Sequence, residues 1–237
     1  MNIGFSAIAA ALLSATVLAA PANAQVAGIA TADTSVAIAR SKALGQAYQQ
    51  IGTQYAAAAQ QMQAKRAEIN SINMQLDTNK DKELTQAEVD AAIKAKNPLL
   101  TQIDTKQREI AQLQDPIVKA QVFVVESIAL KYEAAQQAVI NAKKINVILA
   151  PDAFVWAPDS VDVTTLITAE LDKSTPTVGI TPPANWRPSR QAAAVYQQIQ
   201  QMFENAARAQ AAQAQAAQPQ PGQPAAPATP APQPDSR

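Results

Sequence analysis

The stretch DTNKDKELTQAE, residues 77–88, carries oxygen-bearing side chains at the spacing of a calcium-binding loop. In a twelve-residue loop of this kind, side chains at the first, third and fifth positions bind the ion, the seventh residue adds its carbonyl oxygen, and a glutamate closes the set at the twelfth. Helical patterns flank the loop on both sides, as an EF-hand requires. The predicted ligands of this EF-hand-like calcium site are Asp77, Asn79, Asp81, Glu83 and Glu88.

The same stretch also fits a metal-free helix start. Lys82 stands at the sixth position, where glycine normally makes the sharp turn, and its charge would lie near the ion. Thr85 is followed three residues later by Glu88, which is the pattern of a capping box. Thr85 could alternatively act on calcium through a water molecule. The sequence leaves two interpretations open, a calcium loop that stiffens the chain locally and a solvated, capped turn.

The composition excludes several kinds of chemistry. The 237-residue chain has no histidine and no cysteine, so it lacks the usual general base near neutral pH, a thiol nucleophile and a zinc–thiolate site. It also shows no glycine-rich phosphate loop. We therefore expect a protein that is not an enzyme and requires no cofactor. Lys+Arg and Asp+Glu number 19 each, which argues against a nucleic-acid partner.

Residues 1–24 have the pattern of a secretory signal peptide. The apolar run IAAALLSATVLAA is followed by Ala22-Asn23-Ala24, an A-x-A cleavage site. A membrane anchor would need about 20 apolar residues, and Pro21 interrupts this run. The sequence therefore predicts cleavage after Ala24 and a mature protein that begins at Gln25 in a bacterial periplasm.

Two long segments of helical character must position the candidate loop. Apolar residues recur every three or four positions in residues 34–76 and in residues 98–143, which is typical of a coiled-coil seam. Pro98 fits a first helical turn, whereas Pro116 should kink the second helix or restart it. The two seams contain Leu44, Tyr48, Ile51, Tyr55, Ala58, Met62, Ile69, Ile72 and Leu76, and then Leu99, Ile103, Ile110, Leu113, Ile117, Val124, Ile128, Tyr132, Ala135 and Val139.

Because the two segments are about equal in length, they predict an antiparallel hairpin with arms on the order of 60 Å long. Residues 77–97 would form its tip. If Leu76 lies near Pro98, the numbers of facing residues add up to about 174. This register gives each lysine that interrupts a seam a carboxylate neighbour. The facing pairs are Lys65 with Glu109, Glu68 with Lys106, and Arg66 with Arg108.

Short apolar runs at both ends of the hairpin predict strands. These runs are residues 26–33, 145–150 and 153–157, and the last two, separated by Pro151 and Asp152, indicate a β-hairpin. Asp33 or Ser35 should cap the first helix, and Asp162 or Thr164 a short helix that ends near Asp172. The predicted fold class is mainly α with a small β body, built around a long antiparallel coiled-coil hairpin.

The C-terminal part is of a different kind. Residues 174–190 hold four prolines and should lack regular structure, with Trp186 as an anchor on the body or as a binding contact. An amphipathic helix is predicted at about 190–209, with one apolar face. Residues 210–237 consist largely of Ala, Gln and Pro and should be disordered. The apolar face of the helix consists of Ala192, Val195, Tyr196, Ile199, Met202 and Phe203.

The order of these elements behind a signal peptide resembles the Skp/OmpH-like periplasmic chaperones. IATADTSVAIARSKALGQA, from Ile29, is similar to that family's first strand and the start of its first arm. AVINAKKINVILAPDAFVWAPDSVDVTTLITAEL, from Ala138, is similar to the end of the second arm, the strands and the entry to the closing helix. The resemblance implies that residues 25–33 and 144–173 form a trimerisation body and that residues 34–143 form the arm.

The resemblance also implies a function. Family members are homotrimers whose arms surround a cavity, and this cavity holds unfolded outer-membrane proteins without ATP. We therefore expect a homotrimeric holdase chaperone whose partners are unfolded outer-membrane proteins, with a membrane surface as a further partner left open. The alternative is a calcium-binding coiled-coil protein of the cell envelope with a structural or adaptor role. The sequence does not indicate which arm residues contact cargo.

Overall fold

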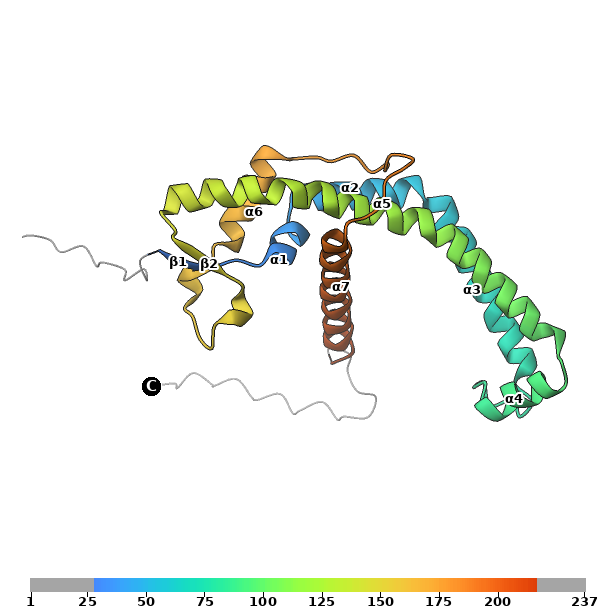
Figure 1. Cartoon of the computed structure of the whole chain (residues 1–237). Coiled ribbons are helices and arrows are strands. Elements are labelled where there is room, and N and C mark those ends of the chain that lie inside the picture. The colour runs from blue at the N-terminus through green and yellow to red at the C-terminus, as the bar shows by residue number, and fades with distance from the viewer. Residues whose placement is uncertain (1–27, 217–237) are drawn as a thin grey trace, which may run out of the picture.

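The computed structural model describes residues 28–216 and shows a bent two-helix rod with a small strand region at its root (Figure 1). Residues 1–24, the predicted signal peptide, lie outside the described residues. The elements in chain order are β1 Ile29–Thr31, α1 Thr34–Ala39, α2 Lys42–Gln54, α3 Ala56–Leu76, α4 Gln86–Lys94, α5 Pro98–Lys143, β2 Val147–Leu149, the 3-10 turns η1 Pro151–Ala153 and η2 Asp159–Val161, α6 Thr164–Ser174 and α7 Arg190–Ala216.

The predicted hairpin is confirmed. Helices α2 and α3 run along α5, and α4 lies at the tip where the chain reverses (Figure 1). Ion pairs join Lys65 to Glu109 and Glu68 to Lys106, so the predicted register is correct. Arg108 pairs instead with Asp104 on its own helix. All the seam residues named from the sequence are buried or half-buried, because apolar side chains at heptad spacing face the partner helix.

The first arm is not the single helix that its uninterrupted pattern predicts. The chain leaves the helix at Arg40, and the Ser41 side chain accepts a hydrogen bond from the Leu44 backbone N–H to start α2. A milder irregularity lies at Tyr55, where the backbone hydrogen bonds from Ile51 to Ala59 continue across the junction. Asp33, rather than Ser35, caps α1 by accepting from the Val36 N–H.

Helix α5 runs without interruption through Pro116, so the restart, one of the two predicted alternatives to a regular helix, is wrong. Figure 1 shows α5 following the curve of the whole rod. A proline in a helix interior removes one backbone donor but does not force the helix to end when a partner helix packs along it. Pro98 occupies the first turn, as predicted, and the Asn97 side chain accepts from the Leu99 N–H.

The main apolar core lies at the root of the rod, where α1, α2, α5, α6 and α7 meet. A second, small cluster at the tip joins the end of α3 to α4 and the start of α5. In the middle of the rod each helix packs against only one other helix, so this part buries little apolar surface. The largest fully buried side chains, all at the root, are Ile38, Leu44, Val124, Val125, Ile128, Ile167, Leu171 and Ile199.

The strands correct one prediction. β1 pairs with β2 in parallel, with Ile29 opposite Val147, and a single further bridge joins Thr31 to Asp162. Residues 153–157 form no strand, so the predicted hairpin between residues 145–150 and 153–157 is wrong. Pro151 starts a 3-10 turn, and the segment after it finds no strand partner within the described chain.

The structure confirms the linker without regular structure and the amphipathic helix that were predicted in the C-terminal part. Helix α6 starts beside Asp162, whose carboxylate accepts from the Thr164 backbone N–H and hydroxyl. Residues 175–189 contain no helix or strand. The predicted amphipathic helix exists as α7 and continues to Ala216, so residues 210–216 are helical rather than disordered; the remainder of the predicted tail lies outside the described residues. Within residues 28–216, no helix combines the length and apolarity needed to cross a membrane.

Candidate functional site

The predicted calcium loop forms a compact turn at the tip of the rod, between α3 and α4. Asp77, which follows α3, is buried and uses both carboxylate oxygens inside the loop. One oxygen accepts from the Lys80 N–H at 2.6 Å and the other from the Lys82 N–H at 2.8 Å. Both lysines have left-handed backbones, with φ of 62° and 72°. The Lys82 backbone therefore adopts the conformation that glycine usually supplies at this position.

The middle of the loop is held by two further side chains. The Asp81 N–H donates to the Asn79 side-chain oxygen, and the Glu83 N–H donates to Asp81, both at 2.8 Å. The Asn79 amide also donates to the second Asp81 oxygen. The Glu83 side chain is exposed and makes no hydrogen bond, in keeping with a predicted role that uses only its backbone carbonyl.

Glu88 ties the two ends of the loop together. One of its carboxylate oxygens accepts from the Thr78 N–H and hydroxyl and from the Asn79 N–H. The other accepts from the Thr85 N–H and hydroxyl, which completes the predicted capping box. These donors, the Thr85 backbone N–H first, lower the pKa of Glu88 from 4.5 to about 2 because they stabilise its charged form.

The geometry supports the capped turn directly. In the described residues, no three carboxylate, histidine or cysteine side chains converge as they would around a metal ion. The five predicted ligands are nevertheless gathered in one loop, with Asp77, Asn79 and Asp81 folded inward by their hydrogen bonds. Calcium binding stays a prediction.

A second candidate site is the apolar surface at the root, which the sequence analysis did not single out. Val147 and Leu149 of β2 are exposed, and so is Val155 in the loop that follows. Trp156 is 79% exposed, which is unusual for so large an apolar side chain. Strand edges with apolar side chains invite pairing with another chain. The sequence marked these residues as strand formers but gave no sign that they would be uncovered.

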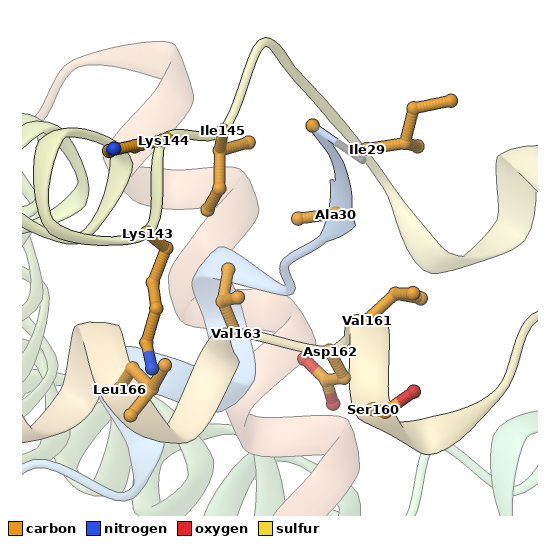
Figure 2. A pocket seen from close by; sticks show the side chains of 11 residues that line it. Ile29, Ala30, Lys143, Lys144, Ile145, Ser160, Val161, Asp162, Val163 and Leu166 are labelled. Carbon is orange, nitrogen blue, oxygen red and sulfur yellow. The ribbon is translucent and has the colours of Figure 1, made fainter. Parts of the chain in front are cut away.

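A cavity of about 290 Å³ lies beside this surface, between β1, the end of α5 and the start of α6 (Figure 2). Figure 2 shows Ile145 and Val163 in its lining, with Lys143 on one side and Asp162 on the other. The Asp162 carboxylate accepts hydrogen bonds from the Thr164 backbone N–H and hydroxyl at the start of α6, whose N-cap is Val163. The cavity thus combines apolar walls with a few charged and polar side chains, among them Ser160.

The third candidate surface is the concave side of the rod. Figure 1 shows that the rod bends towards one side, and that the β1–β2 root, α4 and α7 all lie on that side. Helix α7 packs on α1 and α5 at the root end. Trp186, in the segment before α7, donates from its indole N–H to Glu126 at 2.7 Å and meets Phe123 edge-on. It therefore anchors the extension on the body, one of its two predicted uses.

The sequence matches a family model over most of the described residues. The family model described as "Outer membrane protein (OmpH-like)" matches residues 28–171, from the first strand to the closing helix. A crystal structure from Caulobacter crescentus CB15, described as an OmpH-like outer membrane chaperone, is 20% identical, covers 65% of this chain and 89% of that chain, and has a TM-score of 0.42. A search of curated proteins gives no match. Since the family model spans more than half of the sequence, the chain belongs to the OmpH-like family.

Proposed function

We propose that this protein is a periplasmic holdase chaperone that binds unfolded outer-membrane proteins without ATP. Membership of the OmpH-like family is the observation that carries the proposal. The described residues support it, because they form a slender two-helix rod beside an uncovered strand edge. Many weak apolar and polar contacts along such a rod suit clients of varied sequence, because no single rigid pocket has to fit them. The predicted signal peptide supports this location, because it would direct the protein to the compartment that these clients cross.

The working unit in this proposal is a homotrimer. Strands of three residues in a two-stranded sheet are too small to be stable alone. The exposed Val147, Leu149 and Trp156 would be covered if three copies joined their roots around a threefold axis. The three rods would then enclose a space for one client.

Dilution of a urea-denatured β-barrel protein tests the holding activity. The client is diluted into buffer that contains a calcium chelator and no nucleotide, and light scattering reports its aggregation. The mature protein, from Gln25 onward, should suppress the scattering at stoichiometric amounts. Equal scattering with and without the protein would contradict the proposal.

The trimer is tested by a matched pair of variants. Leu149→Asp puts a charge on the exposed face of β2 and should yield monomers in analytical ultracentrifugation. Leu130→Asp puts the same charge at an exposed position on α5, 76% accessible, and should leave the mass unchanged. A wild-type protein that sediments as a monomer would refute the shared root.

A second candidate function is calcium binding at the tip, and the conformation of Lys82 favours it. The loop already holds this residue at φ 72° and turns Asp77, Asn79 and Asp81 inward. Calcium would then compete with the capping hydrogen bonds of Glu88 and would stiffen the tip. The client-holding activity would not depend on it. Protection of the client in chelator separates the two functions.

A further inference from the structure

Helix α7 and the segment that leads to it lie beyond the family match, which ends at residue 171. The elements beneath α7, namely α1, α2 and α5, lie inside that match. Helix α7, from outside the matched segment, thus covers a surface that lies within it. In Figure 1 the preceding segment passes along the rod from α6, and α7 then extends from the rod on its concave side.

The contact between α7 and the arms is confined to the first half of the helix. Ala192, Val195 and Ile199 are buried, and Val195 and Ile199 join the root core. Residues 204–216, the second half, are exposed at every position. The helix thus touches the body through one narrow apolar stripe, as a separate amphipathic peptide would lie in a groove.

The surface beneath α7 has an apolar floor and a polar rim. Tyr48 of α2 meets the Phe203 ring edge-on, and its hydroxyl accepts from the Gln200 amide. On the rim, the Ser35 hydroxyl donates to Gln198 and the Tyr196 hydroxyl donates to Gln121 at 2.9 Å. Polar groups flanking an apolar strip suit a chain that alternates apolar and polar side chains. Transmembrane β-strands have that pattern, together with aromatic residues at their ends.

The segment before α7 has few polar anchors, and its apolar contacts with the root core come from Val178 and Ile180. Residues 175–189 form a linker without helix or strand, and Glu126 alone receives its two anchoring hydrogen bonds, from the Trp186 indole and the Ser189 N–H. We propose that the face of α1, α2 and α5 beneath α7 is a binding site for apolar–aromatic segments of an unfolded client, and that α7 is its built-in occupant, which a client displaces. This inference rests on the proposed chaperone function and assigns its binding surface.

A reversible lock tests the displacement. Gln121→Cys and Tyr196→Cys introduce the only two thiols of the chain, one on α5 and one on α7, and a short reducible bis-thiol crosslinker joins them. The affinity for a urea-diluted β-barrel protein is measured before and after reduction, with each single-cysteine variant as a control. If α7 has left its site in about one wild-type molecule in ten, a variant in which α7 is always released should bind the client about tenfold more tightly than the wild type. The lock should weaken binding by at least that factor, and reduction should restore it.

A release variant provides the opposite change. Ile199→Asp places a charge in the buried stripe and should tighten client binding, whereas Gln197→Asp, on the exposed side of the same helix, should not. Circular dichroism checks that the root stays folded, and if Ile199→Asp unfolds it, the lock alone decides. Equal affinity of the locked, reduced and Gln197→Asp proteins would overturn the inference and leave the chaperone function standing. Absence of client binding in every form would overturn both.

Discussion

Lys65 and Glu109 form an ion pair across the two arms although 44 positions separate them in the sequence. One turn nearer the tip, Glu68 and Lys106 form a second pair in the same register. Each lysine occupies a gap in an apolar seam, and the facing carboxylate allows it to be partly buried there. The pair with Lys106 also lowers the pKa of Glu68, through a hydrogen bond and the opposite charge.

Reversing one charge of the Lys65–Glu109 pair should lower the stability of the rod, and reversing both charges should restore it. Lys65→Glu places two carboxylates together and should lower the free energy of unfolding by about 1 kcal/mol, since exposed pairs contribute at most about that much. The double variant Lys65→Glu/Glu109→Lys should recover most of the loss in urea denaturation. Additive losses in the double variant would show that the two residues do not interact.

Truncating the buried core of α5 should cost far more. Ile128 is fully buried at the root, and Ile128→Ala should lower the free energy of unfolding by about 2–5 kcal/mol, because it removes apolar contacts and leaves a cavity. Leu130→Ala, two residues away on the exposed face of the same helix, is the control and should change stability little. Equal effects of the two substitutions would contradict the packing described at the root.

Pro116 lies inside α5, where it removes one backbone donor. Pro116→Ala restores the donor and should raise the free energy of unfolding by about 1–3 kcal/mol, seen as a higher midpoint of thermal denaturation. Pro98→Ala serves as the control, because a proline in the first turn is favourable and its loss should lower the midpoint slightly. A lower midpoint for Pro116→Ala would mean that the rod requires the proline for its curve.

Acid should destabilise the loop and α4 at the tip before it destabilises the root. The folded pKa of Glu88, about 2, lies below its ordinary value of 4.5, so its contribution is complete above about pH 4.5 and is lost as the pH falls towards 2. The protection factors of the α4 amides, which correct for the intrinsic pH dependence of exchange, should therefore fall across this window. Glu88→Gln should raise the exchange already at neutral pH, whereas Glu83→Gln, an exposed residue without side-chain hydrogen bonds, should not. Protection factors of the α4 amides that stay constant between pH 5 and 2 would rule out this role of Glu88.

Calcium binding at the tip should depend on Lys82. Lys82→Gly removes a positive charge from the loop, which should favour the bound cation. It also relieves a left-handed backbone strain of about 1 kcal/mol or more, which the metal-free loop already bears and which should therefore raise stability rather than affinity. Isothermal titration should show tighter calcium binding by this variant than by the wild type, whose dissociation constant should lie near 10⁻⁴–10⁻³ M. No heat from either protein at millimolar calcium would end the calcium hypothesis.

Patterns that depend on neighbouring turns were readable from the sequence. The two seams and the capping box of Thr85 and Glu88 follow from spacings of three or four residues. The tip and the register of the arms follow from the equal lengths of the two helical segments. The residue types of 26–33 and 145–150 predicted strands at the root, and the structure pairs Ile29 with Val147 there.

Features set by distant partners were not readable. Phe154, Val155 and Trp156 favour a strand by residue type, but no strand of the described chain pairs with them. The apolar face of α7 could be predicted from its periodicity, whereas its position on α1 and α5 depends on a linker without regular structure. Ser41 has the residue type of a helix cap, and this local signal could have revealed the break before α2.

Native mass spectrometry of the mature chain, mixed with an outer-membrane protein diluted from urea, tests the central claim most directly. The account predicts a complex of three copies that holds one unfolded client and forms without nucleotide. Free monomers together with aggregated client, and no complex between them, would contradict it.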